Sequence, residues 1–277
     1  MIYRTFLRLS IFALAAFIFG FLTEQNPGLL VNSSWMRSWL AAPTFLAAPP
    51  LQADNLAFKV GERLTYRISW SNFVEAGTAE LTVGSGSPAV ANSYRFQLKA
   101  ISTPAISRLY SFKDEFVSLF DGGLSAPTRF EKNFVEKKRE LRETVIFDQF
   151  NHSATFANGK SEDYKISIDA GTQDPLSALY TVRSLVLKPG FQVVLPVLDG
   201  GKNFQLEIKV TGSDLISTGL GNFSSHRVEV RLRRDGIPLT DKNMTIWFTN
   251  DTRKVPVLAS ISLPFGAALV ELTSQSN

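Results

Sequence analysis

From residue 58 onward, the chain alternates apolar and polar residues with a period of two. Leu64, Tyr66 and Ile68, for example, are separated by Thr65 and Arg67. This is the period of a half-buried β-strand, in which successive side chains point to opposite faces of a sheet. Roughly 11–13 segments of this kind follow one another, separated by turn sequences. The pattern therefore predicts a mainly β fold.

The connections between these segments indicate how the strands are ordered. A parallel sheet built from βαβ units would need a helix between each pair of strands, and only one long helical segment occurs after the N-terminal part. Turn sequences such as Asp121-Gly122-Gly123 and Asp199-Gly200-Gly201 are typical of hairpins instead. We therefore expect a curved antiparallel sheet or open β-barrel that forms one domain over residues 54–277.

The one long helix is predicted at about residues 175–188. Asp174 can cap it, Pro175 suits its first position, and Pro189-Gly190 ends it. Placed at 100° steps, the polar residues gather in one narrow strip, which consists of Ser177, Thr181, Ser184 and Lys188. The rest of the circumference is apolar, so the helix should be buried. We expect it to be embedded in the concave face of the sheet.

Arg183 is the exception on the apolar side of this helix. A buried guanidinium needs a partner, because burying an unpaired charge is strongly unfavourable. The partner is either an internal carboxylate or the acidic head group of an amphipathic ligand whose tail fills an apolar cavity. The internal candidates are Asp114, Glu115, Glu131 and Asp199. The residues predicted to bind a ligand are Arg183, Leu176, Leu179, Tyr180 and Leu187.

Residues 1–53 resemble an export segment more than part of a fold. Arg4 and Arg8 stand before an apolar run at residues 9–22, which is the layout of a signal sequence and is short for a membrane span. Two interpretations remain open. The run is either an uncleaved anchor, with membrane association through residues 6–22 and a linker behind it, or the chain starts at Met36 and is cleaved after Ala53. Both predict a location in the periplasm or elsewhere in the cell envelope.

The residue inventory argues against an enzyme. Cysteine is absent, which excludes disulfides, thiol catalysis and cysteine-bound metals. The two histidines, His152 and His226, stand apart, and no zinc-protease, serine-hydrolase or phosphate-binding motif occurs. We therefore expect no cofactor, no metal and no catalytic residue. A hydrolase of envelope glycans that uses paired carboxylates is the remaining catalytic alternative.

The charge pattern gives no indication of a nucleic-acid partner. The net charge is +4, but most Lys and Arg residues are interspersed with Asp and Glu. One basic group is more one-sided, and it suits either an anionic lipid surface or a solvated strand face. It consists of Arg227, Arg231, Arg233 and Arg234.

Several short segments, taken in order, resemble a bacterial family of exported proteins, the domain-of-unknown-function family 3108. These segments are Gly61-Glu62 with the alternating run to Trp70, Arg129-Phe130-Glu131, residues 174–180, Asp199-Gly200, and Asp251 with Pro256 and Gly266. The resemblance covers residues 58–273. It implies an envelope location and a mainly β fold, and it supplies no catalytic residues.

The end of the chain is similar to the last strands of periplasmic lipoprotein carriers. The similarity rests on Asp251-Thr252-Arg253, Pro256 and the β sequence that runs to Leu272. Those carriers fold as an open barrel with a helix in an apolar cavity, so the similarity is one of architecture. The chain lacks the cysteine that would carry a lipid anchor in the outer-membrane receptor of that group.

These observations lead to one principal functional hypothesis and one alternative. The principal hypothesis is a non-enzymatic envelope protein that binds or carries a lipid or another hydrophobic molecule between its sheet and its helix. The 22 phenylalanines suit the walls of such a site, and they suit a filled β core equally well. The alternative is a structural or interaction protein of the envelope, with a filled core and a protein partner at a sheet edge.

Overall fold

The computed structural model describes residues 46–47, 56–70, 74–108, 111–136, 139–157, 162–239, 244–263 and 266–276. The predicted export segment within residues 1–53 lies outside this set, apart from a two-residue strand. None of the helices in the described residues is long and apolar enough to cross a membrane.

The described residues form strands and two helices. In chain order they are β1 (Leu46–Ala47), β2 (Arg63–Trp70), β3 (Val74–Ser85), β4 (Ser93–Ser102), α2 (Pro104–Ser107), β5 (Phe112–Asp121), β6 (Ala126–Glu136), β7 (Arg139–Asp148), β8 (Ser153–Ala157), β9 (Tyr164–Ser167), α3 (Pro175–Ser184), β10 (Gln192–Asp199), β11 (Lys202–Thr218), β12 (Gly221–Arg234), β13 (Ile237–Pro238), β14 (Met244–Thr249), β15 (Pro256–Leu263) and β16 (Gly266–Ser276).

All strands belong to one 16-stranded sheet. Its order is β1-β10-β11-β12-β14-β15-β16-β2-β3-β4-β5-β6-β7-β8-β9, with β13 added beside β12. Every pairing is antiparallel except that of β1 with β10. Strands β1 and β9 stand at the two ends of this order and do not pair with each other, so the predicted open antiparallel sheet is confirmed. The sheet has more strands than the 11–13 expected, and two of the 16, β1 and β13, are too short for alternation to indicate them.

The alternation in sequence becomes an alternation in burial. In β2, the side chains of Leu64, Tyr66 and Ile68 are buried, and Arg63 and Arg67 are exposed. The register with β3 places Tyr66 opposite Ala79 and Ile68 opposite Gly77. The buried side chains therefore line one continuous face, which becomes the concave side of the sheet.

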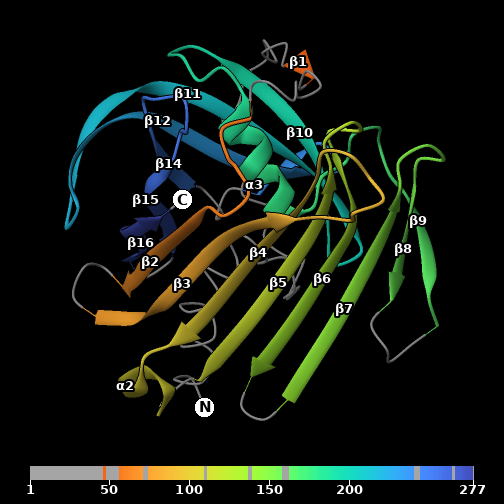
Figure 1. Cartoon of the computed structure of the whole chain (residues 1–277), viewed down its shortest axis with the longest axis horizontal. Coiled ribbons are helices and arrows are strands. Elements are labelled where there is room, and N and C mark those ends of the chain that lie inside the picture. The colour runs from red at the N-terminus through yellow and green to blue at the C-terminus, as the bar shows by residue number, and fades with distance from the viewer. Residues whose placement is uncertain are drawn as a thin grey trace, which may run out of the picture.

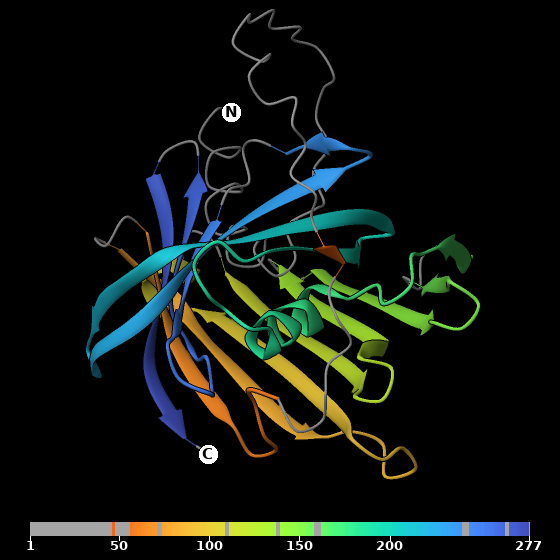
Figure 2. The same cartoon turned by 90° about the horizontal axis from the view of Figure 1, so that it is seen from above.

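The sheet curls around α3, which lies on the concave side (Figures 1 and 2). Helix α3 contacts β4, β5 and β10. Strands β14, β15 and β16 form the opposite wall, seen in blue to the left of the helix in Figure 2. Irregularities in pairing, for example at Trp247/Phe248 and Leu272/Ser274, occur in this wall. Bulges of this kind bend a strand and increase its twist, and so favour curvature.

The helix begins where the sequence predicts and ends earlier. Asp174 accepts hydrogen bonds from the backbone N–H of Leu176 (2.8 Å) and of Ser177 (2.9 Å), and the Ser177 hydroxyl accepts one from the Asp174 N–H (3.0 Å). This is a capping box. The helix stops at Ser184 instead of residue 188, because Leu185 is extended (ψ 162°). Leu185 and Leu187 are buried and Val186 is exposed, which is the alternation of an extended segment.

The chain that leads into α3 links two regions that are distant in the strand order. Gln173 donates its N–H to the Pro196 carbonyl (2.8 Å) and accepts from the Leu198 N–H (2.9 Å), so it pairs with β10. The Asn203 amide donates to the Ser167 carbonyl in β9 (2.8 Å). These contacts hold the β9 end of the sheet near β10 and fix the point at which the helix starts.

Candidate functional site

Arg183 lies near the C-terminal end of α3 and has no exposed surface. Its guanidinium donates two hydrogen bonds to the carboxylate of Glu62, from Nη1 to Oε1 (2.6 Å) and from Nη2 to Oε2 (2.8 Å). It also donates to three backbone carbonyls, those of Ala57 (3.0 Å), Arg253 (3.1 Å) and Lys254 (3.2 Å). The bidentate geometry is that of a strong charge-assisted pair.

Electrostatics within the pair keep Arg183 charged. Burial by itself lowers the pKa of a guanidinium, but the hydrogen bonds and the negative charge of Glu62 outweigh it, so the pKa of Arg183 lies above its usual value. The guanidinium also faces the ring of Tyr180 at 5.1 Å from the centroid. Tyr180 in turn stacks on Phe96 with a centroid distance of 3.9 Å. The pair is therefore enclosed by aromatic rings and backbone.

The partner of Arg183 is an internal carboxylate, but it is none of the four candidates. Glu62 is a fifth residue, in the turn that precedes β2. The four candidates lie elsewhere: Glu115 bonds to Gln97, Glu131 pairs with Arg129, Asp199 pairs with Lys132, and Asp114 is buried in β5. Glu62 stands outside the alternating strands, and this is why strand periodicity did not point to it. With its guanidinium fully buried, Arg183 presents no exposed donor to a ligand head group.

Three segments that carry the family resemblance meet at Arg183. Gly61 has a positive φ (97°), a conformation that favours glycine, and it positions Glu62 behind it. Asp251 accepts hydrogen bonds from the N–H groups of Arg253 (3.1 Å) and Lys254 (3.0 Å), and this shapes the turn whose carbonyls face the guanidinium. The third segment is α3 itself. Arg183 therefore joins the helix to the segment before β2 and to the turn between β14 and β15.

An apolar cavity lies beside α3, between the helix and the curved sheet. It has a volume of about 440 Å³, which includes the part open to solvent. Its lining comes from the helix, from β2, β3 and β4, and from β14, β15 and β16. The lining residues are Tyr66, Ala79, Leu81, Leu98, Leu179, Ile246, Pro256, Leu258, Ala259 and Val270.

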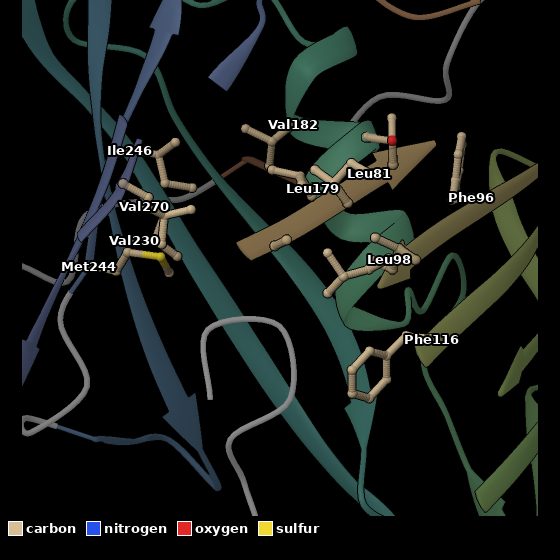
Figure 3. Packing of buried hydrophobic residues seen from close by; sticks show 14 of the residues in the cluster. Leu81, Phe96, Leu98, Phe116, Leu179, Val182, Val230, Met244, Ile246 and Val270 are labelled. Carbon is tan, nitrogen blue, oxygen red and sulfur yellow. The ribbon is translucent and has the colours of Figure 1, made fainter. Parts of the chain in front are cut away.

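Figure 3 shows the two walls from close by. Ile246 and Val270 project from one side, Leu81 and Leu98 from the other, and Leu179 lies on the helix between them. Of the five residues predicted to bind a ligand, Leu179 lines the cavity. Leu176, Tyr180 and Leu187 are buried in the hydrophobic core. The helix singled out in the sequence thus contributes one residue to the cavity lining. The strand residues of the lining were not predicted, because alternation does not tell which strands face each other.

Two buried tyrosine hydroxyls near this site have no hydrogen-bond partner among the described residues, those of Tyr66 and Tyr180. Tyr66 is 3% exposed and lines the cavity, and Tyr180 is 1% exposed and belongs to the aromatic cluster. Burial raises the pKa of each phenol above its usual value, and Arg183 opposes this shift in both. Both hydroxyls therefore stay protonated and remain available as hydrogen-bond donors.

A second buried charge cluster lies on the concave face of β6. Lys132 forms an ion pair with Asp199 at the end of β10, and its ammonium lies 3.6 Å from the Glu143 carboxylate. The ammonium also lies 5.6 Å from the ring centroid of Phe130 and 6.0 Å from that of Phe134. The side chains of Lys132 and Asp199 are at most 2% exposed. Like Arg183 with Glu62, the pair connects distant strands through a buried contact.

The one-sided basic group of the sequence is balanced in the structure. Each of its arginines forms an ion pair with a nearby carboxylate: Arg227 with Asp214, Arg231 with Glu229, Arg233 with Glu207, and Arg234 with Asp235. The basic group is therefore paired with acidic neighbours along these strands. Within the described part of the chain, no group of three or more His, Cys, Asp or Glu side chains could hold a metal ion.

Among solved structures, the chain is similar to a beta-barrel-like protein of domain of unknown function DUF1849 from Brucella abortus. The TM-score is 0.55, the identity is 11%, and the match covers 78% of this chain and 97% of the other. This likeness supports the β-barrel-like fold. The hypothetical protein CT021 from Chlamydia trachomatis aligns over 79% of this chain and 88% of its own, with 14% identity and a TM-score of 0.35.

No curated protein matches the chain in sequence. The family model described as "Protein of unknown function (DUF3108)" matches residues 65–273. The matched region begins within β2, contains α3 with Arg183, and ends within β16, so it holds every residue that lines the cavity. The chain therefore belongs to the DUF3108 family of proteins of unknown function.

Proposed function

We propose that this protein is an exported envelope protein that binds a hydrophobic ligand in the cavity beside α3. One observation carries the proposal: the cavity is lined by apolar side chains from both walls of the sheet and from the helix, and among the described lining residues only Tyr66 carries a polar group. Transfer of an apolar group from water to such a surface is favourable in proportion to the area that is buried.

The size of the cavity limits the ligand. Ligand pockets in proteins typically measure about 300–1,000 Å³. The 440 Å³ of this cavity include space open to solvent, so its enclosed part is smaller than a typical ligand pocket. A slender molecule, such as one acyl chain, suits this space better than a fused-ring compound. The ligand class that we propose is therefore a single-chain lipid or a similar unbranched molecule.

The surrounding contacts hold the cavity in shape. Helix α3 is fixed at its start by the Asp174 capping box and near its end by the Arg183–Glu62 pair. Leu179 lies between these two points. Because the helix is held at both ends, the cavity need not be assembled by the ligand, and a preformed site loses less free energy to ordering on binding.

Native mass spectrometry of the full chain, with solvent extraction of the purified protein, tests ligand binding. We expect apolar molecules to co-purify, and delipidated protein to bind the fluorescent probe N-phenylnaphthylamine. Ala259→Leu places a larger side chain in the cavity and should abolish most of this binding. Ala154→Leu is the matched control, because Ala154 is 1% exposed in β8 and lies away from the lining.

The two alanine variants also differ in their expected stability. Leucine at position 259 has space to enter, whereas leucine at position 154 must displace packed neighbours, so only the control should lose about 1–3 kcal/mol of unfolding free energy. The proposal is wrong if wild-type protein neither carries an apolar molecule nor binds the probe, or if Ala259→Leu binds as well as wild type. Such a result would favour the alternative, a structural protein of the envelope.

Export is supported by the N-terminal sequence, in which Arg4 and Arg8 precede the apolar residues 9–22. Fusion of residues 1–53 to a reporter enzyme that is active only outside the cytoplasm tests this part. Active reporter is the expected result. The intact mass of the mature protein then distinguishes a retained anchor from cleavage after Ala53. An inactive reporter would contradict export.

A further inference from the structure

Strand β10 would be an edge of the sheet if β1 were absent. Among the described strands, β10 pairs only with β11 on one side and with the two-residue strand β1 on the other. An edge strand exposes a row of backbone N–H and C=O groups that can pair with another chain. The first half of β10, Gln192–Leu195, is uncharged and contains two adjacent valines, so an open edge here would favour association.

The backbone groups on the β1 side of β10 can be identified from one contact. The Pro196 carbonyl accepts a hydrogen bond from the Gln173 N–H (2.8 Å), and the Leu198 N–H donates one to the Gln173 carbonyl (2.9 Å). Residues two apart in a strand direct their backbone groups to the same side, so the N–H and C=O of Val194 also point away from β11. Proline suits this side, because it has no N–H to leave unpaired.

Strand β1 covers the backbone of Val194. It runs parallel to β10, with Leu46 opposite Val193 and Ala47 opposite Val194. Figure 1 shows β1 on the side of β10 and away from β2, the next strand in the chain. Strand β1 and Gln173 therefore cover the first and the second half of this side of β10. The chain protects its own sheet edge with a segment from its N-terminal part.

The residues shortly after this segment are also bound to the folded domain. Ala57 and Phe58 are buried. The Ala57 carbonyl accepts a hydrogen bond from Arg183 (3.0 Å), and the Phe58 ring packs edge-on against the Tyr180 ring with a centroid distance of 5.2 Å. The chain is therefore held at two points before β2, at β10 through Leu46–Ala47 and at the end of α3 through residues 57–58.

We propose that β10 is an acceptor site for the chain's own N-terminal segment, and that residues 46–47 stay in the mature protein as an added strand that covers this edge. Removal of the chain up to Ala53 would take β1 away and leave the backbone of Val194 open. The mature chain therefore begins before Leu46, as in the interpretation with an uncleaved anchor. The inference does not depend on ligand binding in the cavity.

An engineered disulfide tests the position of β1, because the chain has no cysteine of its own. Neighbouring strands lie about 4.7–4.9 Å apart, within the Cα separation that a disulfide spans. Ala47→Cys/Val194→Cys in the full chain should form an intramolecular disulfide under mild oxidation, detected by peptide mass mapping. Ala47→Cys/Lys209→Cys is the matched control, because Lys209 lies in β11, one strand farther away, and this pair should stay reduced. Failure of the first pair to link, or equal linking of both pairs, would overturn the assignment.

Amide hydrogen exchange in the full chain gives a second readout. Leu46→Pro/Ala47→Pro removes the backbone donors of β1 and should speed exchange of the Val194 amide by about 5-fold or more. The Leu195 amide points to β11 and is the internal control. It should stay protected, which also shows that the variant is folded. Unchanged exchange at Val194 would mean that β1 does not cover this edge.

The intact mass of wild-type protein, purified from the cells that produce it, tests whether the segment is retained. We expect a chain whose first residue precedes Leu46. A folded protein that begins at Asp54 would contradict retention, even if it binds an apolar ligand. Loss of ligand binding with the segment in place would instead count against the proposed function alone.

Discussion

Arg183 and Glu62, 121 residues apart in the chain, form a bidentate ion pair that is buried beneath the turn between β14 and β15. The pair joins α3 to the turn before β2, and the same guanidinium bonds to backbone on either side of it. A buried pair contributes little net stability compared with apolar residues of similar volume, but removal of one partner leaves a buried charge uncompensated. Its main effect here is to fix the helix relative to the cavity wall.

Glu62→Gln should lower the free energy of unfolding by about 3–5 kcal/mol, because it removes the counter-charge of a guanidinium that has no access to water. Arg183→Met should cost a similar amount, since it isolates the Glu62 carboxylate. The double variant Arg183→Met/Glu62→Gln should be more stable than the sum of the single losses predicts, although three carbonyls lose their donor. Urea unfolding measures all four proteins, and additive losses would contradict a coupled pair.

Gly77 in β3 should tolerate no side chain. A Cβ at this position would lie 2.4 Å from the Ile101 carbonyl oxygen and 2.9 Å from the Phe112 ring. Gly77→Ala is therefore expected to lower the free energy of unfolding by about 1–3 kcal/mol through overpacking. Gly84→Ala in the same strand is the control, because its nearest neighbours would lie at 3.8 Å. Thermal or urea unfolding measures the loss of stability in both variants. Equal losses would show that the backbone around Gly77 shifts to make room for a side chain.

Stability should fall as the pH rises from about 4 to 6 through the titration of Asp174. Burial raises the pKa of this carboxyl from 3.8 to about 6, against the opposing hydrogen bonds from Ser118 and Ser177. Because the folded-state pKa lies above the unfolded value, the contribution of Asp174 is fully present below about pH 4 and is lost as the pH passes the folded value. The expected size is about 2–3 kcal/mol.

Asp174→Asn isolates this effect, because asparagine also caps helices and does not titrate. The difference in unfolding free energy between wild type and this variant should change between pH 4 and pH 7 in favour of the variant. Urea unfolding at several pH values measures it. A difference that is independent of pH would show that Asp174 keeps an ordinary pKa.

Lys132→Met should lower the free energy of unfolding by about 3–5 kcal/mol, because Asp199 and Glu143 would lose their buried counter-charge. Methionine keeps the apolar contact with the neighbouring phenylalanine rings, so the loss reports the charge. Lys132→Met/Asp199→Asn should recover part of it. The exposed pair of Arg142 with Glu140 provides the control, since Arg142→Met should change stability by about 1 kcal/mol or less.

The strands and the start of the helix could be predicted from the sequence because they depend on local patterns. Alternation at period two identified the buried face of β2, and Asp174 with Pro175 marked the start of α3. The end of α3 was predicted too late. Pro189-Gly190 indicates where a helix must stop, but Leu185 leaves the helical conformation earlier, and the buried side chain of Leu187 lies on an extended segment.

The composition of the candidate site could be predicted only in part. Arg183 stood out because a charge on an apolar helix face requires a partner, and that inference needs no coordinates. Glu62 did not stand out, because a glutamate in a polar turn is ordinary until the fold buries it. Tyr66 looked like one member of an alternating strand. That its hydroxyl finds no hydrogen-bond partner among the described residues is a property of its surroundings.

The sequence by itself therefore determined that this chain forms an open antiparallel sheet with one buried helix, since side-chain periodicity and capping act between residues that are neighbours in the chain. Only the tertiary structure decided which carboxylate meets Arg183 and which strands face each other across the cavity. Those outcomes depend on how far the sheet curls, and curvature is the sum of twist and bulges over many strands. No short stretch of sequence contains that sum.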